Sequence, residues 1–184
     1  MSTRCCAALI YCTWVLMLLA QDNAIDAESV LKNFTKRVGD YVELHNRVKG
    51  EVHGLKPTSS AEAIEKYEHR FAARLREERS GAARGSIFSP DIAVEFRRLI
   101  SATMRGPDGS AIRIALQRAA PVHLALRVNH AYPSGAPLQS TPPSLLLNLP
   151  HLPPEVDYRV VGSDLILRDV DANLIVDVLP NAIS

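Results

Sequence analysis

The sequence predicts an α+β protein, and two patterns carry this prediction. In the first half of the chain, apolar residues recur every three or four positions, which is the spacing of one helix face. After residue 155, apolar residues alternate with polar ones in three short segments separated by turn residues. We therefore expect an N-terminal antiparallel helical hairpin, one long and one short further helix, and then a small antiparallel sheet. The length of 184 residues suits one compact unit.

Residues 1–20 are expected to be a signal peptide. Arg4 is followed by sixteen residues without a charge, from Cys5 to Ala20, as in a basic region followed by an apolar core. Ala20 supplies the small residue before a cleavage site, although Leu18 at the −3 position is large for the peptidase. The alternative is a retained N-terminal membrane anchor, but sixteen helical residues span only about 24 Å of a hydrocarbon core about 30 Å thick. We expect an extracytoplasmic protein, periplasmic or secreted.

Composition excludes several classes of function. Cys5, Cys6 and Cys12 all lie in the signal segment, so the mature chain would have neither thiolate chemistry nor disulfides. The net charge is +1 and aromatic residues make up only 5%, which argues against a nucleic-acid partner. The sequence contains no Gly-rich phosphate loop, no G-x-S-x-G elbow and no H-E-x-x-H motif. We expect neither an enzyme nor a bound cofactor.

Residues 21–118 form the predicted helical region. The first helix is expected over residues 26–53, with an apolar seam of Leu31, Phe34, Val38, Tyr41, His45, Val48 and Val52. After Gly54, Ser59 and Glu62 have the spacing of a capping box and predict the start of a second helix. Its apolar stripe is Ile64, Tyr67, Phe71 and Leu75. This stripe is shorter than the seam, so helix three, the sheet or a second copy of the chain must cover the rest.

Two further helices follow. Ser89, Pro90 and Asp91 supply an N-cap, a first-turn proline and a first-turn acid, which predict a third helix to about Met104. A short fourth helix is expected over residues 110–118. We expect the third helix to cover the seam through Ile92, Phe96, Leu99 and Ile100.

Residues 119–184 are predicted to be a Pro-rich and β region that packs on the helices. Alternation predicts one strand at residues 122–128. Residues 133–154 then hold seven of the twelve prolines, but also the apolar run 145–149, so we expect an ordered, extended wrap across the domain. Strands are expected at 156–161, 164–169 and 174–179, joined as a meander.

Three segments carry a resemblance to a known family: residues 85–90 (GSIFSP), residues 96–100 (FRRLI) and the tail from Leu152-Pro153-Pro154 to Val178. With them the chain resembles a family of small exported bacterial proteins of unknown function. The tail alone, about 30 residues, is similar to the C-terminal hairpin of RcnB-like periplasmic proteins, which are tied to nickel and cobalt homeostasis. The resemblance implies export and a shared fold; the tail brings no metal ligands.

The candidate metal ligands are His45, His53 and His69. His45 and His53 lie about 12 Å apart along one helix, and His45 falls on the apolar seam, which favours a buried histidine with a satisfied ring. Glu65 and His69 are spaced i,i+4, which is typical of a solvated pair on so charged a helix. The stretch 169–173 resembles the start of a calcium loop, but Leu174 and Pro180 stand where that loop needs Gly and Glu, so a turn is expected.

Two function classes follow from these observations. The first is an exported, non-enzymatic protein that binds another protein or the cell envelope. The alternative is a periplasmic protein that binds a small ligand or a metal ion. Self-association through the helical hairpin stays open as well.

Overall fold

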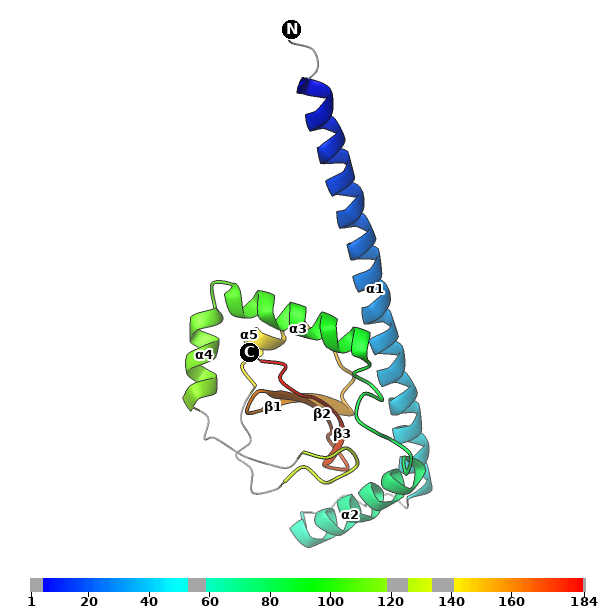
Figure 1. The fold of residues 1–184 in the computed structure, drawn as a ribbon. Coiled ribbons are helices and arrows are strands. Elements are labelled where there is room, and N and C mark those ends of the chain that lie inside the picture. Colours follow the sequence, from blue (N-terminus) through cyan, green and yellow to red (C-terminus); the bar gives the residue numbers. More distant parts are fainter. Residues whose placement is uncertain (1–4, 53–58, 119–125, 134–140, 184) are drawn as a thin grey trace.

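The computed structural model describes residues 5–52, 59–118, 126–133 and 141–183, and for residues 5–25 it describes the backbone only. The helices are α1 (Cys5–Glu51), α2 (Ala61–Glu78), α3 (Pro90–Arg105), α4 (Gly109–Arg118) and α5 (Pro143–Leu146). The strands are β1 (Val156–Val161), β2 (Asp164–Asp169) and β3 (Leu174–Leu179). The predicted α+β fold is confirmed (Figure 1).

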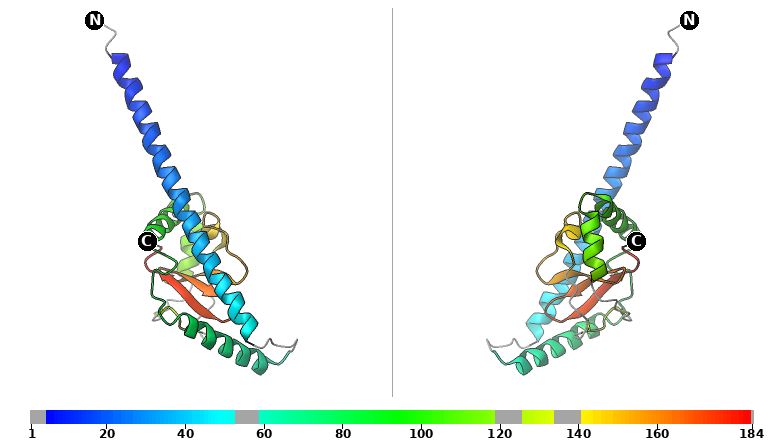
Figure 2. Two further views of the ribbon diagram at one scale, coloured as in Figure 1. Left: turned by 90° about the vertical axis from the view of Figure 1, so that its right-hand side faces the viewer. Right: turned by 90° about the vertical axis from the view of Figure 1, so that its left-hand side faces the viewer.

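Helix α1 is continuous from the apolar N-terminal segment into the folded body. Its C-terminal half packs on the other elements, while its N-terminal half projects away from them (Figures 1 and 2). Five seam residues are buried as predicted: Phe34, Val38, Tyr41, His45 and Val48. Among the described residues, no helix combines the length and the apolar character needed to cross a membrane.

The C-terminal end of α1 pairs in antiparallel order with the C-terminal half of α2. Arg47 contacts Glu78 at 2.9 Å, and Glu51 contacts Arg74 at 3.0 Å. In Figure 1, α2 lies below the sheet, with its N-terminal end away from α1 and its C-terminal end beside α1. The cap of α2 differs from the expected one by one residue, because the side chain of Ser60, not Ser59, accepts the backbone N–H of Ala63.

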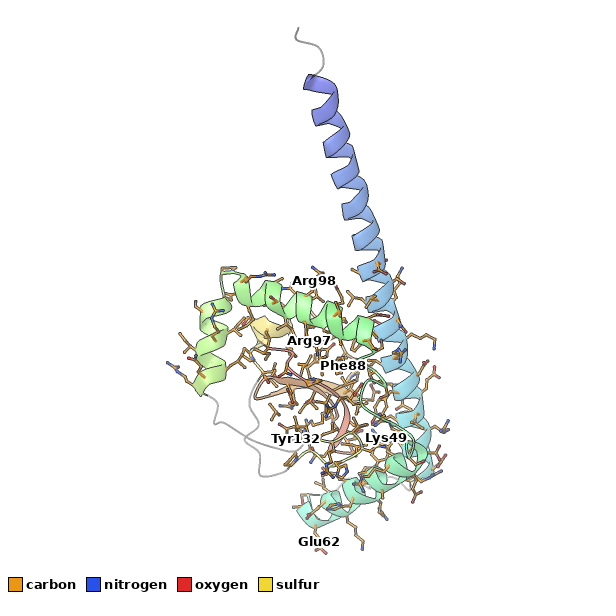
Figure 3. The ribbon with its side chains drawn as sticks, viewed as in Figure 1. Lys49, Glu62, Phe88, Arg97, Arg98 and Tyr132 are labelled. Atoms are coloured by element: carbon orange, nitrogen blue, oxygen red, sulfur yellow. The ribbon has the colours of Figure 1, made fainter. Side chains whose placement is uncertain are left out.

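Helix α3 covers the remaining seam of α1, as predicted. The rings of Phe34 and Phe96 lie 4.7 Å apart between their centroids, and Phe88 packs on both. Figure 3 labels Arg97 and Arg98 on opposite sides of α3. Arg97 bonds the carbonyls of residues 180 and 181, so α3 is also tied to the chain that follows β3.

The three strands form an antiparallel meander in the order β1-β2-β3, with the predicted bounds. Tyr158 pairs with Leu167 across β1 and β2, and a bulge interrupts the β2–β3 pairing at Leu167 and Arg168. Gly162 has a φ of +60° in the β1–β2 turn, a conformation that favours glycine. One face of the sheet packs on α1, α3 and α5. The other face is covered in part by Leu126 and Tyr132.

The structure corrects two expectations in the second half of the chain. The strand expected at 122–128 falls mostly outside the described residues, and residues 126–128 are not in a strand. Instead the chain beyond them forms an isolated bridge between Ala131 and Leu174 of β3. The described part of the Pro-rich wrap is not simply extended, because Pro143–Leu146 form one helical turn. Within the apolar run 145–149, the side chains of Leu145 and Leu149 are buried, as expected.

Candidate functional site

A buried histidine–carboxylate pair joins α1 to the end of β2. The Nδ1 of His45 lies 2.6 Å from an Asp169 oxygen, and both side chains are 0% exposed. Phe71 of α2 meets the imidazole edge-on, with ring centroids 5.0 Å apart. Asp169 also accepts the backbone N–H of Ala172, which is the turn expected at 169–173. The pair is enclosed on all sides, so a substrate cannot touch it in this conformation.

The pair extends along α1 to Tyr41. The Tyr41 hydroxyl donates to the same Asp169 oxygen at 2.6 Å. Burial raises the pKa of Tyr41 well above its ordinary value, and the Asp169 charge adds to the rise. The guanidinium of Arg79 lies 5.0 Å from the centre of the Tyr41 ring, a distance suited to a cation–π contact.

Arg79 is a buried cation held by neutral acceptors. It is 7% exposed and donates to Asn129 and to the carbonyl of Val176, each at 2.8 Å. Burial lowers the pKa of Arg79, and the nearby Tyr41, Asp177 and Asp169 oppose this shift. No carboxylate among the described residues forms an ion pair with it.

Asp177 links the α2–α3 connection to the sheet by hydrogen bonds. Its carboxylate is 0% exposed and accepts four backbone N–H groups, from Gly85, Ile87, Phe88 and Val178. Hydrogen bonds to an ionised carboxylate are about twice as strong as neutral ones. The connection that bears Ser86 is therefore fixed against β3.

The network reaches the surface at Asp171. This residue lies 3.5 Å from the second ring nitrogen of His45, which has no hydrogen-bond partner among the described residues. On its other side Asp171 pairs with Lys49 at 2.5 Å. The hydrogen bond to Asp171 raises the pKa of Lys49.

Two of the depressions on the described surface adjoin α1. The α1–α3 groove, about 810 Å³, lies where α1 leaves the body and is lined by Asp26, Ala27, Val30, Asp91, Val94, Glu95 and Arg98. The Arg79 pocket, about 500 Å³, lies between α1 and the α2–α3 connection. Its lining is Asn33, Lys36, Arg37, Asp40, Tyr41, Leu44, Arg79, Ala82, Ser86 and Ile87.

The three candidate metal ligands are not brought together in the described structure. His45 is buried with a satisfied Nδ1, as its place on the seam predicted. His69 is exposed on α2 and lies 3.6 Å from Glu65, the solvated pair that was expected. His53 lies outside the described residues. The described residues contain no group of three His, Cys, Asp or Glu side chains that could hold a metal ion.

Sequence reasoning missed the partners of these groups. The expected strands 164–169 and 174–179 include Asp169 and Asp177, but no local pattern gives a role to these two residues or to Arg79. One signal was present for Asp177, because a lone carboxylate interrupts the apolar strand Leu174–Leu179, and a buried charge requires partners.

Comparisons of this chain with family models, with curated proteins and with solved structures find no match.

Proposed function

We propose that the chain is an exported, non-enzymatic protein that binds another protein through the α1–α3 groove. The observation that supports this proposal best is Val94, an aliphatic side chain that is 67% exposed on the wall of the groove. Ala27 and Val30 of α1 line the same groove. Covering such apolar surface releases about 25 cal/mol per Å², so a partner that fills the groove gains free energy there.

The charges around Val94 indicate the kind of partner. Asp26, Asp91 and Glu95 line the groove, and Arg98 is its only cation among the described lining residues. Arg98 already forms an ion pair with Glu95, at 2.6 Å. The remaining negative charge favours a protein segment that carries both basic and apolar side chains. It disfavours an anionic membrane surface, because like charges repel.

Site-specific crosslinking tests the groove. A photo-crosslinking amino acid at position 94 should give an adduct in intact cells, and one at Ile114 should not. Ile114 is the matched control because it is also an exposed aliphatic residue, 49% exposed on α4. Asp91→Lys should reduce the adduct at position 94 by reversing a groove charge. Equal adducts at both positions, or none at position 94, would contradict the proposal.

The mass of the adduct identifies the partner class. An adduct of twice the chain mass would assign the groove to self-association, which is the other partner that the helical seam suggested. An adduct with a different protein would support the proposal as stated.

Export is a separate part of the proposal and has its own test. It rests on Arg4 and the charge-free run from Cys5 to Ala20. N-terminal sequencing of protein from fractionated cells should find a mature chain that starts near Gln21 outside the cytoplasm. A chain with intact Met1 in the membrane fraction would assign these residues to a retained anchor, and one in the cytosol would contradict export.

A further inference from the structure

The Arg79 pocket combines an excess of positive charge with apolar lining residues. Three of its lining residues are cationic, namely Lys36, Arg37 and Arg79, and one is acidic, Asp40. Such an excess of positive charge in a depression about 500 Å³ in volume raises the local concentration of anions.

Arg79 is the most buried of these cations. A guanidinium has five N–H donors, and the described contacts of Arg79 use two acceptors, Asn129 and the Val176 carbonyl. The two carboxylates that raise its pKa through space, Asp177 and Asp169, form their hydrogen bonds with other groups: Asp169 with Tyr41 and His45, and Asp177 with backbone N–H groups. Arg79 is therefore a positioned cation whose charge is not neutralised by direct contact.

Two groups on the wall add to this arrangement. Arg37 donates to the backbone carbonyl of Ser86 at 2.8 Å, which holds its charge beside the pocket. The hydroxyl oxygen of Ser86 is buried and has no hydrogen-bond partner among the described residues. A buried hydroxyl without a partner costs free energy, and a ligand oxygen in the pocket would supply that partner.

Apart from Asn33, the rest of the lining is apolar and would contact the body of the ligand. Leu44, Ala82, Ile87 and the ring of Tyr41 line the pocket together with the charged groups. We infer that the Arg79 pocket binds a small organic anion, with its carboxylate or phosphate head at Arg79, Arg37 and Ser86 and a short apolar chain on Leu44 and Ile87. This site lies apart from the α1–α3 groove and is independent of the function proposed for that groove.

Two neighbouring ion pairs on α1 provide a controlled test. Lys36 and Asp40 form an i,i+4 pair beside the pocket, with side chains 72% and 58% exposed. Glu28 and Lys32 form an i,i+4 pair on the same helix, 69% and 76% exposed, and neither lines the pocket. Lys36→Gln removes a pocket cation and should weaken binding. Asp40→Asn removes the only acid among the described lining residues and should strengthen binding. Glu28→Gln and Lys32→Gln are the matched controls.

The probes are hexanoate and hexyl phosphate, with hexanol as the neutral comparison, titrated into the purified chain by NMR. Both anions, or one of them, should saturate shifts at Tyr41, Ser86 and Ile87, and hexanol should not. Lys36→Gln should raise Kd about two- to fivefold and Asp40→Asn should lower it by a similar factor, which is the range for one exposed charge. The controls should leave Kd unchanged. Arg79→Lys, checked for folding by circular dichroism, should weaken binding further because the planar fork is lost.

Three results would overturn the inference. The first is that neither anion binds saturably to the folded parent chain. The second is that hexanol binds as tightly as the anions. The third is that Lys36→Gln and Asp40→Asn change Kd no more than their controls do. If Arg79→Lys does not fold, the opposite signs expected for Lys36→Gln and Asp40→Asn still decide the question. Binding of only one head group supports the site and identifies its chemistry.

Discussion

His45 and Asp169 lie 124 positions apart in the sequence and meet with 2.6 Å between Nδ1 and the carboxylate oxygen, both at 0% exposure. This contact holds the C-terminal part of α1 against the end of β2. The two residues thus connect the helical region to the meander inside the core.

Replacing His45 should therefore cost stability. His45→Leu leaves Asp169 buried with one donor fewer, and breaking a buried pair from one side typically costs about 3–5 kcal/mol. The expected result is a lower urea midpoint with an unchanged slope. The double variant His45→Leu, Asp169→Leu should recover part of the loss, because no uncompensated charge stays buried. An unchanged midpoint in His45→Leu would show that the pair does not hold α1 to the sheet.

Tyr41 should make the protein sensitive to alkaline pH. Burial, reinforced by Asp169, raises the pKa of Tyr41 in the folded state, whereas an unfolded tyrosine ionises near pH 10. The folded state therefore favours the neutral phenol. The stability from this group is complete below about pH 10 and falls as pH rises above it, because only the unfolded chain releases the proton.

Denaturation of Tyr41→Phe between pH 8 and 11 checks this effect. The variant should be less stable at pH 8 by about 1 kcal/mol, since the hydrogen bond to Asp169 is lost, and its stability should fall less steeply above pH 10. Burial also raises the pKa of Tyr158, so part of the slope should persist. Tyr67→Phe is the control, because Tyr67 stacks on Phe71 at 6.0 Å and is only half-buried. Equal slopes in Tyr41→Phe and in the parent would contradict the assignment.

Two leucines in the apolar run of the Pro-rich segment, Leu145 and Leu147, should respond differently to truncation. Leu145 is 0% exposed in the main core, whereas Leu147, two residues later, is 74% exposed. Leu145→Ala should lower the free energy of unfolding by about 2–5 kcal/mol through the cavity it leaves. Leu147→Ala should change it by less than about 0.5 kcal/mol. Similar effects of both changes in thermal denaturation would mean that this segment does not pack as described.

The regular elements could be predicted from the sequence because their signals are local. The alternation of apolar and polar residues and the Gly162-Ser163 turn define β1 and β2 within residues 156–169. The observed bounds agree with the prediction. The seam of α1 was predictable for the same reason, since it repeats every three or four residues. The cap of α2 was misplaced by one residue because Ser59 and Ser60 are equally good caps by type, and only the packed geometry selects Ser60.

The contacts of the candidate site could not be predicted, because they join distant parts of the chain. Periodicity placed His45 on a buried face, but Asp169 belongs to a different element, and no local pattern links the two. The Arg79 pocket has the same origin: α1 supplies Lys36 and Arg37, and the connection between α2 and α3 supplies Arg79 and Ser86. Such sites depend on how helices cross, which side-chain packing decides after the elements form.

Two glycines should respond to the same substitution in opposite directions. Gly39 lies within α1, and a Cβ added there would meet nothing within 4 Å. Gly39→Ala should therefore stabilise the protein by about 0.5–1 kcal/mol, since alanine loses less backbone entropy in a helix. At Gly109, which begins α4, an added Cβ would lie 1.9 Å from the backbone oxygen of Met104. Gly109→Ala should lower stability by about 1–3 kcal/mol, because the backbone between α3 and α4 must shift. Thermal denaturation of both variants measures the sign of each change, and a Gly109→Ala protein as stable as the parent would show that this turn is not so closely packed.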